Sequence, residues 1–159
     1  MASETHKELK PGMSAPAFTL TDQHGEKVSL KDFKGRKVAL FFYPKDMTPT
    51  CTNEACSLRD GFSDLQKAGI EVVGVSPDDA VSHQNFISKH ELPYTLLSDP
   101  KTTMMQKYGV WGEKSMYGRK YMGVKRTTFL INPDGKIHEI ITKVEAGKHA
   151  AQILKIWKS

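Results

Sequence analysis

Three short, continuously apolar runs constrain the fold of this chain more than any other feature. They are rich in β-branched and aromatic residues and lack the polar alternation of a strand with one face in water. Such runs are typical of strands buried on both faces of a sheet. Because helical patterns separate them, we expect helices to cover the sheet. The runs are residues 37–43, 71–76 and 127–131.

Helical spacing dominates the stretches between these runs. Apolar residues recur at steps of three and four from Ala55 to Leu65, which predicts one helix over residues 50–67. Ser76 followed by Pro77 predicts the start of a second helix, capped by Ser76 and ending near residue 90. A short strand is expected at 94–97, helices at 103–108 and 149–157, and an antiparallel strand at 136–142.

The N-terminal part adds a hairpin, since two strand-like segments at 17–20 and 27–30 flank a polar loop that ends in Gly25. The element order predicts an α/β protein with a central mixed β-sheet flanked by helices. This is the layout of a thioredoxin-like fold with an N-terminal β-hairpin extension. The 159 residues suit a single domain spanning 1–159, with residues 1–8 as a flexible arm.

Charge and hydropathy set limits on the partners and the compartment. The net charge of +5 is dispersed among acidic residues, which favours a solvated surface over a nucleic-acid interface. The longest apolar run, 38–43, is too short to span a membrane, and the polar N-terminus has no secretory pattern. We therefore expect a cytoplasmic protein without a membrane partner. Basic and aromatic residues mix at 108–126, which indicates a loop over a functional cleft or, less favoured, a site for single-stranded nucleic acid.

Both cysteines follow the first apolar run, as Cys51 and Cys56. Thr48 can cap the helix and Pro49 can occupy its first position, so Cys51 falls in the first turn, where unpaired N–H groups favour a thiolate. Arg126, at the start of the third run, is the best-placed cation by topology. The alternative is an inert, buried cysteine.

Cys56 could be a resolving partner for Cys51 or a small core residue on the helix stripe. Residues five apart in an intact α-helix have Cα atoms about 8.6 Å apart. A disulfide tolerates at most about 7 Å. If the two cysteines bond, the first turns of their helix must unwind, and in a reducing compartment the bond should be transient.

Several ordered motifs resemble the peroxiredoxin family, most closely its Q-type branch, the bacterioferritin comigratory proteins. The resemblance runs in order along nearly the whole chain from Leu9 onward. It is carried by Phe42-Tyr43-Pro44-Lys45-Asp46-Met47-Thr48-Pro49-Thr50-Cys51-Thr52, Glu54-Ala55-Cys56, Leu58-Arg59-Asp60, Gly74-Val75-Ser76, Leu97-Ser98-Asp99, Tyr108-Gly109-Val110-Trp111, Met116-Tyr117-Gly118, Arg126 to Ile131 and Asp134-Gly135.

This resemblance implies a thiol-dependent peroxidase that reduces hydrogen peroxide and organic hydroperoxides. Cys51 would attack the peroxide and become a sulfenic acid, and Cys56 would resolve it as an intramolecular disulfide. Thr48 and Arg126 would bind and polarise the peroxide, and Pro49 would shield the thiolate. The resemblance further implies recycling by thioredoxin or a similar dithiol reductant, no cofactor or metal, and a monomer or weak dimer.

Two features qualify these expectations. The family usually has Gly where this chain has Thr50, and a β-branched residue there is stiffer and narrows the rim of the pocket. The six histidines are scattered and none has ligand spacing to Cys51, which argues against a metal site. Other functions for the same fold are a dithiol–disulfide oxidoreductase, although a C-x-x-C pair is absent, and a redox-sensing or chaperone protein.

Overall fold

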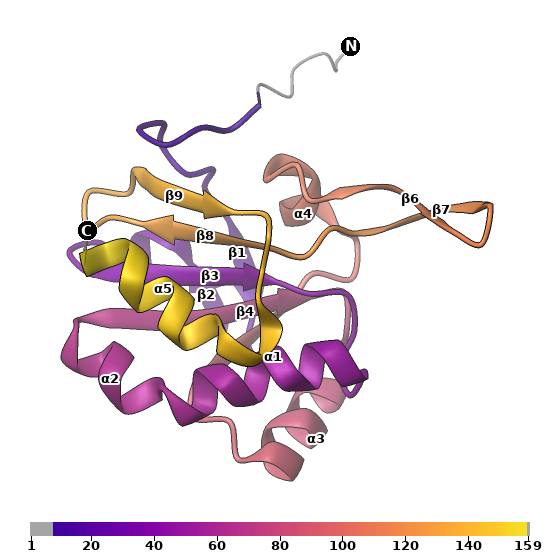
Figure 1. Cartoon of the computed structure of the whole chain (residues 1–159), viewed down its shortest axis with the longest axis horizontal. Coiled ribbons are helices and arrows are strands. Elements are labelled where there is room, and N and C mark those ends of the chain that lie inside the picture. The colour runs from indigo at the N-terminus through magenta and orange to yellow at the C-terminus, as the bar shows by residue number, and fades with distance from the viewer. Residues whose placement is uncertain (1–7, 159) are drawn as a thin grey trace.

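The chain folds around a seven-stranded mixed sheet with the strand order β2-β1-β5-β4-β3-β8-β9 (Figure 1). Strands β3, β4 and β5 are parallel, whereas β8 and β9 at one edge and β1 and β2 at the other run antiparallel to their neighbours. The predicted thioredoxin-like α/β fold with an N-terminal hairpin is therefore confirmed. This computed structural model describes residues 8–158. In chain order the elements are β1 (Thr19–Thr21), β2 (Lys27–Ser29), η2 (Leu30–Phe33), β3 (Lys37–Phe42), α1 (Pro49–Asp60), α2 (Phe62–Lys67), β4 (Ile70–Ser76), α3 (Ala80–His90), β5 (Thr95–Ser98), α4 (Thr103–Lys107), β6 (Trp111–Met116), β7 (Arg119–Val124), β8 (Thr127–Ile131), β9 (Ile137–Ile141), η3 (Ala146–Lys148) and α5 (His149–Lys158).

Each face of the sheet carries its own apolar core. Phe41 and Phe42, neighbours on β3, point to opposite faces because side chains alternate along a strand. Phe41 packs in the cluster that contains residues of α1, α2, α3 and α5, and Phe42 packs with residues of α4. The central strands are thus buried on both sides, as the apolar runs predicted, and α1 lies directly on the sheet.

The helix predicted over residues 50–67 is interrupted at Gly61. Gly61 ends α1 and begins α2, and a Cβ atom at this position would come within 2.4 Å of the Cβ of Ala150 on α5. The continuous apolar stripe could not reveal this break, because its cause is the close approach of α5.

The start of α3 also differs from the prediction. Asp79, not Ser76, is the N-cap, and its side chain accepts a hydrogen bond from the backbone N–H of Ser82 at 2.8 Å. The Ser76 hydroxyl donates instead to Asp78 Oδ2 at 2.7 Å. The predicted Ser76 cap is therefore wrong, because β4 continues through Ser76 and delays the helix.

The basic and aromatic segment 108–126 is mostly not a loop, and only its ends, residues 108–110 and 125–126, line a pocket. Most of it forms the antiparallel hairpin β6–β7, which projects away from the main sheet (Figure 1). Tyr117 at its turn is 99% exposed. The prediction of a covering loop is wrong because these residues pair with each other. The chain returns from this hairpin through Lys125 and Arg126 into β8.

Apart from Glu8, the arm expected at residues 1–8 lies outside the described residues. Within residues 8–158, no helix has both the length and the apolar character needed to cross a membrane.

Candidate active site

The first turn of α1 presents Cys51 at the carboxyl end of β3. Thr48 is the N-cap residue, and its carbonyl accepts the backbone N–H of Thr52 at 2.8 Å. Pro49 occupies the first helical position, where a backbone N–H would have no intrahelical acceptor, so that proline costs no hydrogen bond there. The Thr48 side chain does not cap the helix, because its hydroxyl donates to the Lys45 carbonyl at 2.8 Å. The sequence therefore located the helix start correctly but assigned the wrong partner to the Thr48 hydroxyl.

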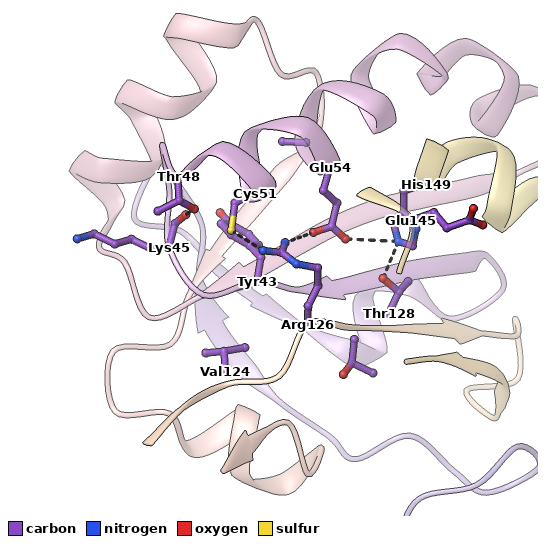
Figure 2. Close-up of polar contacts among 12 residues, drawn as sticks. Tyr43, Lys45, Thr48, Cys51, Glu54, Val124, Arg126, Thr128, Glu145 and His149 are labelled. Atoms are coloured by element: carbon purple, nitrogen blue, oxygen red, sulfur yellow. Dashed lines mark hydrogen bonds and ion pairs between the residues drawn. The ribbon is translucent and has the colours of Figure 1, made fainter. Parts of the chain in front are cut away.

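Arg126 reaches Cys51 from the segment before β8 (Figure 2). Its Nη2 donates to the sulfur of Cys51 at 3.1 Å, and its Nη1 donates to Glu54 Oε1 at 2.6 Å. Cys51 itself is buried, with 2% of its surface exposed. One guanidinium thus lies against both the sulfur and a carboxylate, and a cation in this position favours the thiolate.

Glu54 is a site residue that the sequence reasoning did not single out. It is fully buried, and burial raises its pKa to about 7 although the Arg126 charge acts in the opposite direction. Its Oε2 has no hydrogen-bond partner among the described residues. The available signal was an acidic residue three positions after Cys51, which places both side chains on one face of α1.

A buried histidine lies behind Glu54. His149, the first residue of α5, has its Nε2 3.5 Å from Glu54 Oε2 and 2.7 Å from the Thr128 hydroxyl (Figure 2). Burial lowers the pKa of His149 to about 4, so the ring is neutral at pH 7. No sequence signal connected His149 with Cys51, since the two residues lie far apart in the chain.

The loop before α1 is held by a second buried network, centred on Asp46. Tyr43 donates to Asp46 Oδ1 at 2.6 Å, and Oδ2 contacts the Ser82 hydroxyl at 2.8 Å and His83 Nδ1 at 2.7 Å. The Asp46 backbone N–H donates to Asp78 Oδ2 at 2.7 Å. These bonds tie the loop that carries Thr48 to α3 and to the connection between β4 and α3.

The same network is where a metal site would be sought. Among residues 8–158, Asp46, Asp78 and His83 bring potential ligand atoms within 4.8 Å of one another. Both oxygens of Asp46 already accept hydrogen bonds from side chains, and Asp78 Oδ2 accepts two. The donor set is therefore that of a hydrogen-bonded network, and the residues around Cys51 offer no alternative cluster within the described chain.

Cys56 lies on the same continuous helix as Cys51, is half-buried, and is a free thiol like Cys51. Five residues of intact helix hold two Cα atoms about 8.6 Å apart, which is too far for a disulfide. Tyr94 anchors the middle of α1 by donating to the Ala55 carbonyl at 2.7 Å. A Cys51–Cys56 bond would therefore require the turn before this anchor to unwind.

Thr50 is exposed in the first turn of α1 and has an ordinary helical backbone. The residues with positive φ are elsewhere, including Met47 at 70° in the preceding loop. The backbone here does not demand glycine, so a β-branched residue fits without strain at this position.

Comparisons with known proteins agree with this geometry. A family model described as the AhpC/TSA family matches residues 11–140. A putative peroxiredoxin, bcp, of Coxiella burnetii is 49% identical over 146 residues, which cover 92% of this chain and 97% of the relative. Peroxiredoxin Bcp of Escherichia coli is 46% identical over 146 residues, covering 92% of this chain and 94% of the relative.

Solved structures match as well. The Xanthomonas campestris bacterioferritin comigratory protein, in a trapped intermediate/ligand complex, has a TM-score of 0.86 and 32% identity, covering 94% of this chain and 98% of that chain. A Xylella fastidiosa PrxQ mutant has a TM-score of 0.89 and 28% identity, covering 96% of this chain and 97% of that chain.

The chain therefore belongs to the AhpC/TSA family. Within this family it is similar to the Bcp and PrxQ peroxiredoxins, which confirms the resemblance found in the sequence motifs. Membership assigns it the activity of a thiol-dependent peroxidase.

Proposed function

We propose that Cys51 is the peroxidatic residue and that Cys56 resolves its oxidised form. The observation that carries this proposal is the 3.1 Å contact between Arg126 Nη2 and the sulfur of Cys51 in the first turn of α1. A buried thiol that faces both a helix N-terminus and a guanidinium is favoured as the nucleophilic thiolate.

The first step is attack of the Cys51 thiolate on one peroxide oxygen. The S–O bond forms as the O–O bond breaks, which gives the sulfenic acid and an alkoxide or hydroxide that takes up a proton to leave as alcohol or water. Arg126 stabilises the charge that moves from sulfur to the leaving oxygen. Thr48 orients the peroxide, and Pro49 keeps water from the sulfur.

The second step joins the two cysteines. The Cys56 thiol attacks the sulfur of the Cys51 sulfenic acid, and the disulfide forms with release of water. Because both residues lie on α1, the first turn must unwind in each cycle. A dithiol protein of the thioredoxin type then reduces the disulfide by exchange and closes the cycle.

The proposal also covers the substrate, the oligomeric state and the cellular compartment. Hydrogen peroxide and organic hydroperoxides are the substrates, and alkyl peroxide reduction is the activity named for the Xanthomonas campestris relative. The chain acts as a single domain, as a monomer or weak dimer, without cofactor or nucleic acid. It works in the cytoplasm, where a reducing environment keeps such a pair available for turnover.

Peroxide turnover with thioredoxin and thioredoxin reductase tests these roles. We expect Cys51→Ser to abolish turnover, because it removes the sulfur that Arg126 contacts at the helix N-terminus. Cys56→Ser should keep one rapid reaction with peroxide, followed by one sulfenic acid per chain on mass spectrometry, but lose thioredoxin-dependent recycling. Full turnover by Cys51→Ser would overturn the assignment of the nucleophile.

Amide exchange on the oxidised protein tests the unwinding step. We expect the amides of residues 51–56 to lose protection when the disulfide forms. A Cys51–Cys56 bond with full helical protection over these residues would contradict it.

A further inference from the structure

A buried group of polar side chains behind Arg126 has no part in the steps above. Its outermost member is Gln152 on α5, whose amide is oriented by two backbone bonds. Its Nε2 donates to the Lys143 carbonyl at 2.9 Å, and its Oε1 accepts the Glu145 backbone N–H at 3.1 Å. The amide oxygen, which can only accept, is therefore the atom that faces His149.

This orientation decides which nitrogen of His149 carries a proton. His149 Nδ1 lies 2.8 Å from Gln152 Oε1, so Nδ1 must be the donor. Because the buried ring is neutral, Nε2 has a lone pair and no hydrogen. The Thr128 hydroxyl, 2.7 Å away, can donate to it.

Glu54 Oε2 consequently faces a nitrogen that has no proton to give. The two atoms are 3.5 Å apart, and Oε2 has no hydrogen-bond partner among the described residues. A fully buried carboxylate with one oxygen unsatisfied is strongly destabilised in its charged form. A proton on Oε2 removes this penalty, whereas the single lone pair of Nε2 is already engaged by the Thr128 hydroxyl.

We propose that His149 is a positioning residue for the peroxidase reaction: it holds Glu54 in the neutral, protonated form, so that the charge of Arg126 is left for the Cys51 thiolate. This inference rests on the proposed roles of Cys51 and Arg126. Because Glu54 and Cys51 contact the same guanidinium, at 2.6 and 3.1 Å, a negative charge on one disfavours a negative charge on the other.

The other charged or titratable groups nearby do not supply this control. Glu54 is faced by Cys51 on its own helix, Arg126 before β8, His149 on α5 and Tyr94 before β5. Burial, followed by the charge of Glu54, raises the pKa of Tyr94, so this phenol stays neutral. Arg126 stays charged, and the groups that act on His149 are Gln152 and Arg126 besides Glu54.

Two variants remove the effect of His149 on the protonation of Glu54 in different ways. His149→Asn keeps a donor toward Gln152 but replaces the ring that faces Glu54 by a smaller side chain, so that water can reach Oε2 and donate to it. Gln152→Leu keeps the imidazole but frees Nδ1, so the ring can place its proton on Nε2 and pair with an ionised Glu54. In both, we expect the pH midpoint of the ultraviolet thiolate absorbance to rise by roughly half a unit to one unit. Peroxide reduction measured at a pH below the thiolate midpoint should slow by about three- to tenfold.

Glu54→Gln supplies the diagnostic second change, because its side chain is neutral in any setting. Adding Glu54→Gln to either variant should return the thiolate midpoint to within about 0.3 units of the Glu54→Gln single variant. The control is His138→Asn, which removes a half-buried imidazole that stacks on Trp157 of α5 and should leave the midpoint unchanged.

The result that overturns the role of His149 is an unchanged midpoint in both His149→Asn and Gln152→Leu, or a shift that Glu54→Gln does not reverse. Thermal unfolding shows whether each variant is folded at the assay temperature, and the half-buried Gln152 offers the milder change. Cys51→Ser distinguishes a failure of the proposed function from a failure of the role of His149. If Cys51→Ser keeps turnover, the proposed function is wrong. If Cys51→Ser abolishes turnover but the thiolate midpoint is unchanged in His149→Asn and Gln152→Leu, only the role of His149 is wrong.

Discussion

Two buried histidine–carboxylate pairs flank the start of α1, and they differ in how their hydrogen bonds are completed. In the loop before the helix, Asp46 Oδ2 and His83 Nδ1 are 2.7 Å apart, and both Asp46 oxygens have donors. One turn after Cys51, Glu54 Oε2 and His149 Nε2 are 3.5 Å apart, and that oxygen has no donor among the described residues.

The neighbours of each ring explain the difference. Both nitrogens of His83 have partners, Asp46 on one side and the Leu97 carbonyl at 3.0 Å on the other. His149 has an acceptor on one side and the Thr128 hydroxyl on the other, which favours the neutral ring. The first pair is fully hydrogen-bonded and fixes a loop, whereas the second leaves one carboxylate oxygen beside Arg126 and Cys51 without a donor among the described residues.

The largest expected effect comes from breaking the completed pair. Asp46→Asn removes the buried carboxylate that accepts from Tyr43 and Ser82 and contacts His83, so we expect the free energy of unfolding to fall by about 3 kcal/mol. Chemical denaturation at pH 7 measures it. Asp79→Asn is the matched control, since Asn is an equally good N-cap and should change stability by less than about 0.5 kcal/mol. A similarly small effect for Asp46→Asn would show that the loop does not depend on the pair.

The contribution of Glu54 in the Glu54–His149 pair to the free energy of unfolding should depend on pH. Burial raises the pKa of Glu54 from 4.5 to about 7, so its contribution to stability is fully present below about pH 4.5 and is lost as the pH rises through 7. Glu54→Gln cannot ionise. Relative to wild type, we therefore expect it to gain roughly 1–3 kcal/mol between pH 5 and pH 8. The lowered pKa of His149 acts in the opposite sense as the pH falls from 6.5 toward 4, but it is present in both proteins.

Denaturation curves at several pH values across this range measure the difference. Glu71→Gln, an exposed carboxylate paired with Arg36, is the control and should give a flat line. A flat difference for Glu54→Gln as well would mean that Glu54 is ionised throughout.

The smallest expected effect comes from a change at Thr50, at the start of α1 and just beyond the loop that the Asp46 network holds. The Asp46 network holds the loop up to Thr48, whereas Thr50 lies in the turn whose unwinding we propose for disulfide formation. Thr50→Gly lowers helix propensity by up to about 0.5 kcal/mol, so we expect disulfide formation to speed up by about twofold. Stopped-flow traces separate this step from peroxide reduction, which should change less. Equal changes in both steps would refute the idea, and Thr52→Gly, two residues later on α1, tests whether the effect is specific to position 50.

Local patterns predicted most of the fold because each buried strand and each apolar helix stripe lies within one short segment. The runs at 37–43, 71–76 and 127–131 became β3, β4 and β8, and the predicted α4 and α5 lie within a residue or two of their expected bounds. The predictions failed where a distant neighbour intervenes. Gly61 breaks a helix because Ala150 lies against it, and Ser76 stays in β4, which pairs with β5.

The sequence by itself determined that Cys51 lies in the first turn of a helix, since Thr48 and Pro49 mark the helix start just before it and the backbone there favours an anion. It also limited the Cys51–Cys56 bond, because five residues of helix have a fixed length. Only the tertiary structure decided the charge around the sulfur. Arg126, Glu54 and His149 come from three elements, and their protonation depends on burial and on which lone pairs and N–H groups meet, which no local spacing records.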